Sequence, residues 1–178
     1  MFFVPGILIS IITFPGIIVH ELAHHLFCRW CRVAVFKVVY FQFANPVGYV
    51  FHEQPMYKYQ SILISTGPFL INTILGIVIA LPASLQWQKF DHSNPLDIIL
   101  VYLGVSIAMH AFPSTGDAQN MWQSVMKDPK TNPLLKAIVA PIVGLIYIGA
   151  AGSMIWLDFI YGLAVTLWLP SWLIERFA

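Results

Sequence analysis

Long apolar runs, separated by short polar stretches, dominate the chain. Three runs occupy residues 2–27, 62–81 and 96–112, and each is close to the roughly 20 residues that cross a bilayer as a helix. A fourth, residues 134–174, is interrupted mainly by Asp158 and is too long for one span. It predicts two spans, or one span and an interfacial helix. The pattern therefore predicts an all-α polytopic membrane protein with four or five transmembrane helices.

The connection after the first run has a different pattern. Residues 33–43 and 47–51 are rich in β-branched and aromatic side chains, and Asn45-Pro46 forms a turn signal between them. This pattern predicts a short β-hairpin at about residues 33–52, near the membrane surface. The alternative is a disordered amphipathic loop.

Composition agrees with a membrane protein. Hydrophobic residues make up 58% of the 178 residues and charged residues 10%, whereas soluble domains have about 45–50% and about 25%. The mean hydropathy is +0.76. A formal net charge of +1 and the lack of a basic arm exclude a nucleic-acid-binding surface. The length predicts one membrane-embedded domain, residues 1–178, in contact with the lipid bilayer.

Basic residues in the connections predict the orientation. The first connection holds four basic residues, Arg29, Arg32, Lys37 and Lys58. The second connection holds only Lys89, and the third holds Lys127 and Lys130 with Lys136 at its edge. The positive-inside rule places the first and third connections in the cytoplasm. The carboxyl ends of the first and third spans then share the cytoplasmic side. Polar residues collect at both ends, so we expect a multi-pass protein with its active site towards that side.

The first of these polar groups is His20-Glu21-Leu22-Ala23-His24, an H-E-x-x-H motif in a helical segment. The i, i+4 spacing places both imidazoles on one face, where they can bind one Zn²⁺. Glu21 is the expected catalytic base, which takes a proton from zinc-bound water. Ionisable groups at the end of a membrane span are costly unless they are paired or bind a metal. The alternative is a polar cluster that snorkels to the interface.

A catalytic zinc site needs a third protein ligand. Asp117 is the expected one, because Pro113 and Gly116 break the end of the third span and can turn a carboxylate back towards the helices. The alternative role for Asp117 is a helix cap. His110 is the rival ligand, and it could instead orient Asp117 or contact the substrate carbonyl. Further candidates on the same side are His52, Glu53 and Asp128.

These motifs together resemble the site-2 protease family of intramembrane zinc metalloproteases. The matching stretches are His20 to His24, Gly67-Pro68 followed by Asn72, and Pro113 to Asp117. The resemblance covers about residues 10–120 and implies that Asn72, like His110, binds the substrate or supports the site, in the case of Asn72 by positioning the substrate backbone. The alternative role for Asn72 is a hydrogen bond that packs helices together. No appended PDZ or nucleotide-binding module is visible, so we expect a minimal catalytic core.

The predicted function is that of a zinc-dependent intramembrane endopeptidase. It would hydrolyse a peptide bond in or near a transmembrane segment of a protein or peptide, with His20, His24 and Asp117 as metal ligands and Glu21 activating the zinc-bound water. The alternative is a non-proteolytic metal-binding membrane protein, such as a transporter or sensor subunit. Transporters are expected to show inverted repeats or ligands along a pathway, and the sequence shows neither.

Overall fold

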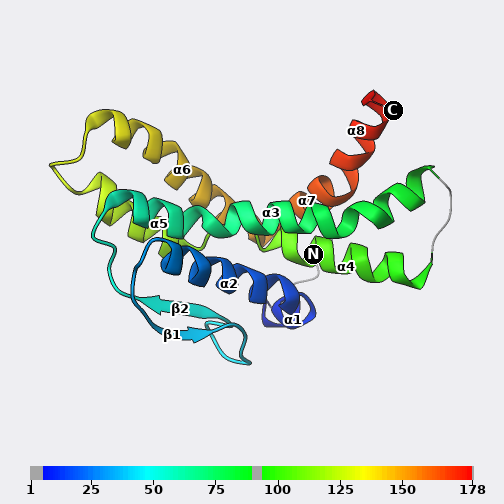
Figure 1. Ribbon diagram of the computed structural model, residues 1–178, viewed down its shortest axis with the longest axis horizontal. Helices are drawn as coiled ribbons and strands as arrows, with labels where there is room; N and C mark the ends of the chain where they lie inside the picture. The colour runs from blue at the N-terminus through cyan, green and yellow to red at the C-terminus, as the bar shows by residue number, and fades with distance from the viewer. Residues whose placement is uncertain (1–5, 90–93, 178) are drawn as a thin grey trace.

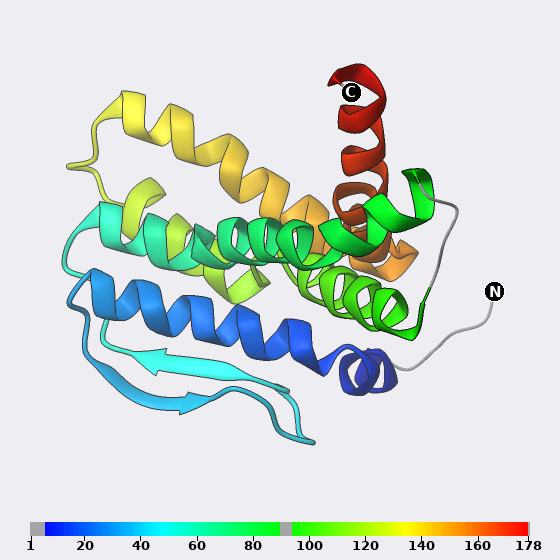
Figure 2. The same ribbon diagram turned by 45° about the vertical axis from the view of Figure 1, so that its right-hand side comes forward.

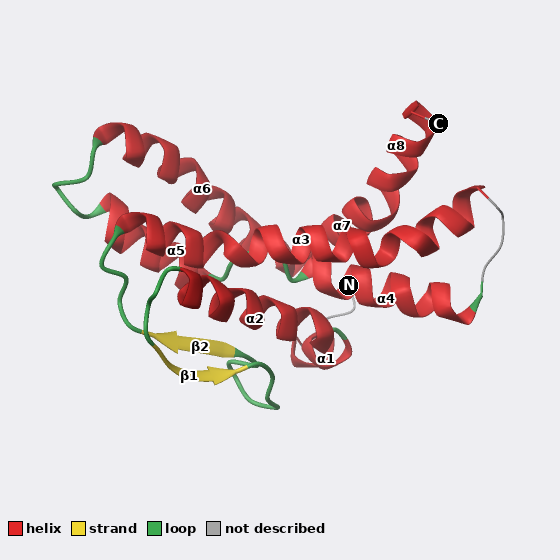
Figure 3. Ribbon diagram, viewed as in Figure 1, coloured by secondary structure: helices red, strands yellow, loops and turns green. Residues whose placement is uncertain are grey.

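The computed structural model describes residues 6–89 and 94–177, which fold into a helical structure with one small sheet (Figures 1 and 3). In chain order the elements are α1 (Gly6–Ile12), α2 (Phe14–Trp30), β1 (Val35–Val39), β2 (Tyr49–His52), α3 (Lys58–Lys89), α4 (Pro95–Met109), α5 (Thr115–Met121), the π-helical turn η1 (Trp122–Met126), α6 (Pro133–Gly152), the 3₁₀ turn η2 (Ser153–Ile155), α7 (Leu157–Leu163), the π-helical turn η3 (Ala164–Trp168) and α8 (Leu169–Phe177).

The long helix α3 organises the rest of the molecule. At one end it lies between α2 with the hairpin on one side and α6 on the other; at the opposite end it packs against α4, with α7 and α8 nearby (Figures 1 and 2). The starts of α3 and α6 lie at the same end, and α4 starts at the other end. The carboxyl end of α4 and the start of α5 therefore come together near the middle of α3, beside α2.

Local sequence signals set several helix boundaries. The Asn94 side chain accepts hydrogen bonds from the Leu96 and Asp97 amides at 2.9 and 3.2 Å, and Asp97 Oδ2 accepts from the Asn94 amide at 2.9 Å. This reciprocal capping box starts α4. A second box, formed by Ser114 and Asp117, starts α5 directly after the Pro113 break. The second box places the predicted ligand in the first turn of a new helix.

Small residues allow α3 and α4 to approach closely. A Cβ added at Gly76 would lie 2.8 Å from the Gly104 carbonyl oxygen, and one at Gly104 would lie 2.6 Å from Ala80 Cβ. Backbones that approach this closely gain extensive van der Waals contact, which is typical of helix pairs in membranes. This close contact fixes α4, and with it the start of α5, against α3.

The hairpin prediction is confirmed. Strands β1 and β2 pair antiparallel, with Val39 opposite Tyr49 and Val35 opposite His52, and the sheet lies against α2. The pairing has an irregularity between Val35 and Lys37. The hairpin thus lies along α2, the helix that contains the H-E-x-x-H motif.

The first predicted segment, residues 2–27, departs from a single helix. Residues 1–5 lie outside the described part; α1 ends at Ile12, and α2 starts at Phe14 after a break at Thr13. Pro15 at the start of α2 explains the break, because proline is compatible with a first helical turn and not with a helix interior. The helix then continues to Trp30, so the H-E-x-x-H motif lies in the middle of α2 rather than at its end.

Two helices in the described part of the chain are long and apolar enough to cross a membrane: Lys58–Trp87 and Pro133–Ile155. The segments Pro95–Met109 and Leu157–Leu173 are apolar but shorter. The prediction of four or five spans is therefore met only in part, and the full count stays a prediction. Residues 134–174 do divide into two helical parts, because the chain turns at Trp156, which has a positive φ of 64°.

Candidate metal centre and its cavity

The two imidazoles of the motif face each other in the middle of α2. His20 Nδ1 lies 2.7 Å from the carbonyl oxygen of His110, and His24 Nδ1 lies 2.9 Å from that of Ile64. A carbonyl only accepts hydrogen bonds, so each Nδ1 carries the proton and donates it. Each Nε2 is then left with a free lone pair, and the two Nε2 atoms are 3.2 Å apart. A hydrogen bond from the ring nitrogen that does not bind the metal, here Nδ1, is the feature that orients metal-binding histidines.

The carboxylate of Asp117 completes the group. Its Oδ2 lies 3.6 Å from His24 Nε2 and accepts hydrogen bonds from the Ser114 amide at 2.9 Å and the Ser114 hydroxyl at 2.6 Å. The two roles considered for Asp117 are therefore combined, because it belongs to the capping box and also faces the histidines. Burial raises the pKa of Asp117, whereas its hydrogen bonds from Ser114 lower it and stabilise the carboxylate form.

The donor set fits a zinc ion. One group of three or more potential ligands occurs within the described ranges, the candidate metal-binding group of His20, His24 and Asp117. Its ligand atoms all lie within 4.8 Å of one another. Zinc bonds of about 2.0–2.1 Å at tetrahedral angles separate neighbouring ligand atoms by about 3.3 Å. The separations of 3.2 and 3.6 Å fall on either side of this value. Two imidazoles and one carboxylate leave a fourth position free, as in catalytic zinc sites.

Glu21 lies beside this group, and its side chain is enclosed by the hairpin. The residue is only 9% exposed. A Cβ added at Gly48, in the loop just before β2, would lie 2.8 Å from Glu21 Cγ and 3.2 Å from its Oε1. Any larger residue at position 48 would therefore displace Glu21. Gly48 is a site residue that the sequence pattern does not reveal, because only the folded hairpin brings it against α2.

A cavity of about 380 Å³ opens beside the histidines and Glu21. His20, Glu21 and His110 contribute to its wall, together with residues of the α4–α5 connection and the end of α6. Asp158, the one acid within the predicted apolar stretch 134–174, also lines it. The cavity therefore reaches the candidate base and His20, one of the three candidate ligands.

His110, the predicted rival for third ligand, contributes its backbone to the site. Its carbonyl oxygen accepts from His20, while its Nε2 lies 2.8 Å from the Thr13 hydroxyl. The imidazole is not part of the three-residue metal-binding group, although His110 does line the cavity.

Asn72 lies behind the site, in α3, and is 0% exposed. Its Nδ2 lies 3.2 Å from the Gly16 carbonyl, 3.0 Å from that of Ile107 and 3.2 Å from that of His110. The amide thus connects α3 to both α2 and α4. The His110 carbonyl that it reaches also accepts from His20, and Asn72 is not among the residues that line the cavity.

The remaining candidates lie elsewhere. His52 ends β2 and bonds to the Glu53 carbonyl, and Asp128 pairs with Lys58 Nζ at 2.9 Å. The hydrogen bond from Lys58 holds the pKa of Asp128 below its ordinary value. Neither these residues nor Glu53 belong to the metal-binding group.

Sequence reasoning also missed Ser114 and the Ile64 carbonyl. The pattern Ser-x-x-Asp is a recognisable capping-box signal, and it could have identified Ser114 as a partner of Asp117. A backbone acceptor such as Ile64 leaves no sequence signal, because any residue supplies the same carbonyl.

Comparisons with known proteins agree with this geometry. A protein-family model described as "putative zincin peptidase" matches residues 13–133, which include all of α2 to η1 and therefore the complete metal-binding group. No curated protein and no solved structure matches the chain.

Proposed function

The chain belongs to this zincin peptidase family, and from that premise we propose that it is a zinc-dependent intramembrane endopeptidase. Zincin peptidases use Zn²⁺, so zinc is the cofactor. The family assignment supports a zinc metallopeptidase. Our proposal adds three features: the intramembrane setting, the catalytic residues and the site-2 protease type. One observation carries it: two imidazole nitrogens and one carboxylate oxygen from α2 and α5 converge next to a buried glutamate.

His20, His24 and Asp117 would hold the metal. The carbonyls of His110 and Ile64 fix the two imidazoles in the tautomer that leaves Nε2 free, and Ser114 fixes the carboxylate. When bound, Zn²⁺ lowers the pKa of a coordinated water and polarises the scissile carbonyl. Pre-oriented ligands reduce the entropy lost when the metal binds.

Glu21 is the proposed general base and acid. It follows the first ligand in α2, lines the cavity and is enclosed by Gly48, so it is held next to any peptide that reaches the histidines. In this position it would take a proton from the attacking water and pass it to the amine nitrogen as the peptide bond breaks. A purely structural metal site would have no use for this carboxylate.

His110 and Asn72 are proposed as positioning residues. The His110 carbonyl accepts from both His20 and Asn72, so the three residues form a connected chain from α3 to the metal-binding group. His110 also lines the cavity, and contact with the substrate is its second proposed role.

The membrane setting rests on the apolar composition and on α3 and α6, both of which can span a bilayer. We propose that α2, α4 and the α7–α8 region cross or enter the membrane as well, giving four or five spans with the site towards the cytoplasm. A transmembrane helix protects its peptide bonds by internal hydrogen bonding, so the substrate must unwind locally before it is cleaved. The β1–β2 hairpin beside Glu21 could pair with the unwound strand.

The site-2 protease type is supported by the order of the motifs along the chain. The H-E-x-x-H motif in α2, Gly67-Pro68 and Asn72 in α3, and Asp117 after α4 follow the order seen in that family. His24 lies 3.6 Å from Asp117, and Asn72 reaches the His110 carbonyl that accepts from His20.

The test is Glu21→Gln in purified, zinc-loaded protein, with metal content and cleavage of a transmembrane peptide measured on the same sample. The substitution keeps the shape of the side chain and removes its basicity. We expect zinc content to stay at the wild-type level and cleavage to fall by at least about a hundredfold. Unchanged cleavage would eliminate Glu21 as the base.

The same assay separates the proposal from a non-proteolytic transporter or sensor. Such a protein would bind zinc through the same three ligands and cleave no peptide in either form. The gathering of the ligands at one point beside a cavity, with Glu21 on the wall, favours hydrolysis over a transport pathway.

A further inference from the structure

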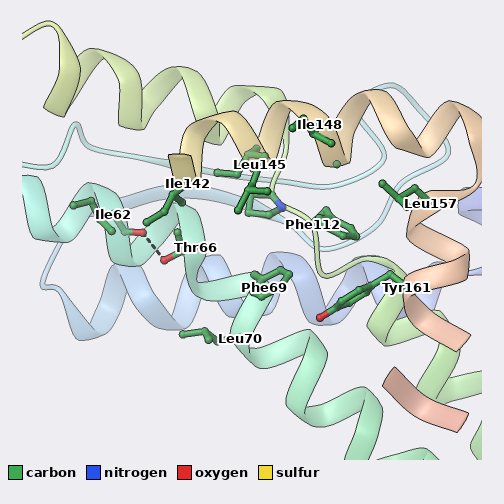
Figure 4. Close-up of a pocket in the computed structure, with 13 residues that line it drawn as sticks. Ile62, Thr66, Phe69, Leu70, Phe112, Ile142, Leu145, Ile148, Leu157 and Tyr161 are labelled. Carbon is green, nitrogen blue, oxygen red and sulfur yellow. Dashed lines mark hydrogen bonds between the residues drawn. The ribbon is translucent and has the colours of Figure 1, made fainter. Parts of the chain in front are cut away.

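A second and larger cavity, of about 560 Å³, lies next to the first between α3, α6 and α7 (Figure 4). Side chains of α6, among them Ile142 and Leu145, lie on one side of it, and Phe69 and Thr66 of α3 lie on the other. Its volume falls within the roughly 300–1,000 Å³ of ordinary ligand sites. The mechanism proposed above does not use it.

The wall of this cavity is apolar, and its few hydroxyls already have partners. Thr66 Oγ1 donates to the Ile62 carbonyl at 2.7 Å, and the Tyr161 hydroxyl bonds to Thr73 Oγ1 at 2.7 Å. The other lining side chains are hydrocarbon or aromatic. An occupant with polar groups would lose hydrogen bonds to water and gain none here, so the cavity selects for hydrocarbon.

The two cavities share a wall. Phe112, Pro113 and Gly149 line both of them. The Phe112 ring packs against Phe69 and Tyr161 with centroids 5.9 and 5.0 Å apart, and a Cβ added at Gly149 would lie 2.7 Å from that ring. Phe112 and Pro113 also lead directly into the capping box that holds Asp117. A chain segment that passes the metal-binding group is therefore within reach of the apolar cavity.

The cavity is also open towards the surroundings. Leu145 and Ile148 on α6 are 64% and 62% exposed, although they line it. The opening lies between α3 and α6, the two helices that are long and apolar enough to span a bilayer. A hydrophobic segment can thus approach from the membrane and reach the site without crossing water.

We propose that this cavity is a specificity subsite that takes a large apolar side chain, such as leucine or phenylalanine, from the substrate next to the scissile bond. The inference rests on the proposed peptidase function and adds a preference to it. Burying such a side chain in place of alanine favours the larger substrate by about tenfold or more. The subsite lies on the α6 side of Phe112, opposite the β1–β2 hairpin.

The first test compares two transmembrane peptides that differ only by leucine or alanine at a position near the cleaved bond. Wild-type enzyme should prefer leucine by about tenfold or more in kcat/KM at one such position. Leu145→Trp, which fills the cavity from an exposed position, should bring that ratio close to one and leave zinc content unchanged. Ile138→Trp is the matched control, since Ile138 is an exposed residue of α6 outside the cavity, and it should keep the preference. A preference equally strong in Leu145→Trp would overturn the proposal.

The second test does not depend on turnover. Photo-leucine, which carries a diazirine, replaces the leucine of the peptide, and the peptide is bound to Glu21→Gln protein in phosphatidylcholine vesicles and irradiated. Mass spectrometry should find the crosslink on residues that line the cavity, such as Leu145 and Ile142. Adducts to lipid alone would show that the leucine faces the acyl chains and would overturn the subsite. If the wild-type protein cleaved no peptide at all, the proposed peptidase function itself would be wrong. Failure of the subsite and failure of the function therefore give different results.

Discussion

At His20 and His24, a backbone carbonyl decides which ring nitrogen is left for the metal. Both Nδ1 atoms donate to carbonyls of other helices, so both Nε2 atoms point to the same place. Asp117 is fixed in the same way by Ser114, which donates twice to one carboxylate oxygen. The chemistry of the site is therefore set by partners outside the H-E-x-x-H motif as much as by the motif.

Gly48 gives the sharpest prediction for a single residue. In Gly48→Ala the new Cβ would lie 2.8 Å from Glu21 Cγ, so the glutamate must move away from its present position. Misplacement of a catalytic group by about 1 Å can cost about a hundredfold in rate. We expect kcat to fall by about tenfold to a hundredfold, with KM and zinc content unchanged, as measured by steady-state kinetics and metal analysis.

The matched control is Gly144→Ala, because a Cβ at that position meets nothing within 4 Å. It should keep wild-type kcat. If Gly48→Ala were as active as Gly144→Ala, the contact between Gly48 and Glu21 would have no role in catalysis.

The sequence predicts the residues of the site better than their surroundings. His20, Glu21, His24 and Asp117 stand out because ionisable side chains are rare in apolar segments. Gly48 and the Ile64 carbonyl carry no such signal, since their role exists only after the hairpin and α3 have packed on α2. The Pro113 break favours Asp117 over His110 in the sequence, but only the structure shows that the His110 imidazole lies against Thr13 and Gly16 while the Asp117 carboxylate lies near His24.

At the level of helices, the site depends on how closely α2 approaches α4. Gly16 makes that approach possible: a Cβ there would lie 1.9 Å from the Ser106 carbonyl oxygen and 2.6 Å from His110 Cδ2. The Gly16 amide also donates to Ser106 Oγ at 3.1 Å. The His110 carbonyl that orients His20 is on the same part of α4, so helix spacing and ligand geometry are linked.

Gly16→Ala should therefore weaken both stability and zinc binding. A backbone atom blocks the new methyl group, so the two helices must separate, at a cost of roughly 1–3 kcal/mol in the free energy of unfolding. We expect a lower midpoint of thermal unfolding and about a tenfold weaker zinc affinity, because His20 loses its carbonyl partner. Wild-type values for both quantities would show that the close crossing of α2 and α4 is not needed for the site.

The helices themselves were partly predictable. Residues 62–81 and 96–109 are helical as the apolar pattern predicts, although α4 ends three residues before the predicted limit of 112, and the hairpin follows from its β-branched and aromatic residues. The extension of α3 from Lys58 to Lys89 was not predicted, because Pro68 and Pro82 are tolerated inside the helix. The break at Thr13 was not predicted, because the segment around it is apolar throughout and only Pro15 marks the break.

The proposed membrane setting predicts how the whole molecule is oriented. The starts of α3 and α6 lie at one end of the molecule and the start of α4 at the other, which agrees with the alternation of basic residues along the connections. The metal-binding group lies between these ends, where α4 gives way to α5.

This arrangement predicts which loops share a side of the bilayer. Three variants test it, each with one cysteine in place of Met56, Leu96 or Lys130, which are all exposed. All three variants lack Cys28 and Cys31. In sealed cells, an impermeant maleimide added outside should label only the cysteine at 96. After the membrane is permeabilised, those at 56 and 130 should react as well. Labelling of all three from the outside would contradict the proposed spans.

The claim on which the proposed function depends is that His20, His24 and Asp117 bind one zinc ion. X-ray absorption at the zinc edge of the purified protein tests it most directly, because it reports the atoms bound to the metal. The structure predicts one zinc per chain with two imidazoles and only nitrogen and oxygen ligands at about 2.0–2.2 Å. Sulfur at about 2.3 Å, which would place the metal on Cys28 and Cys31 instead, would contradict it.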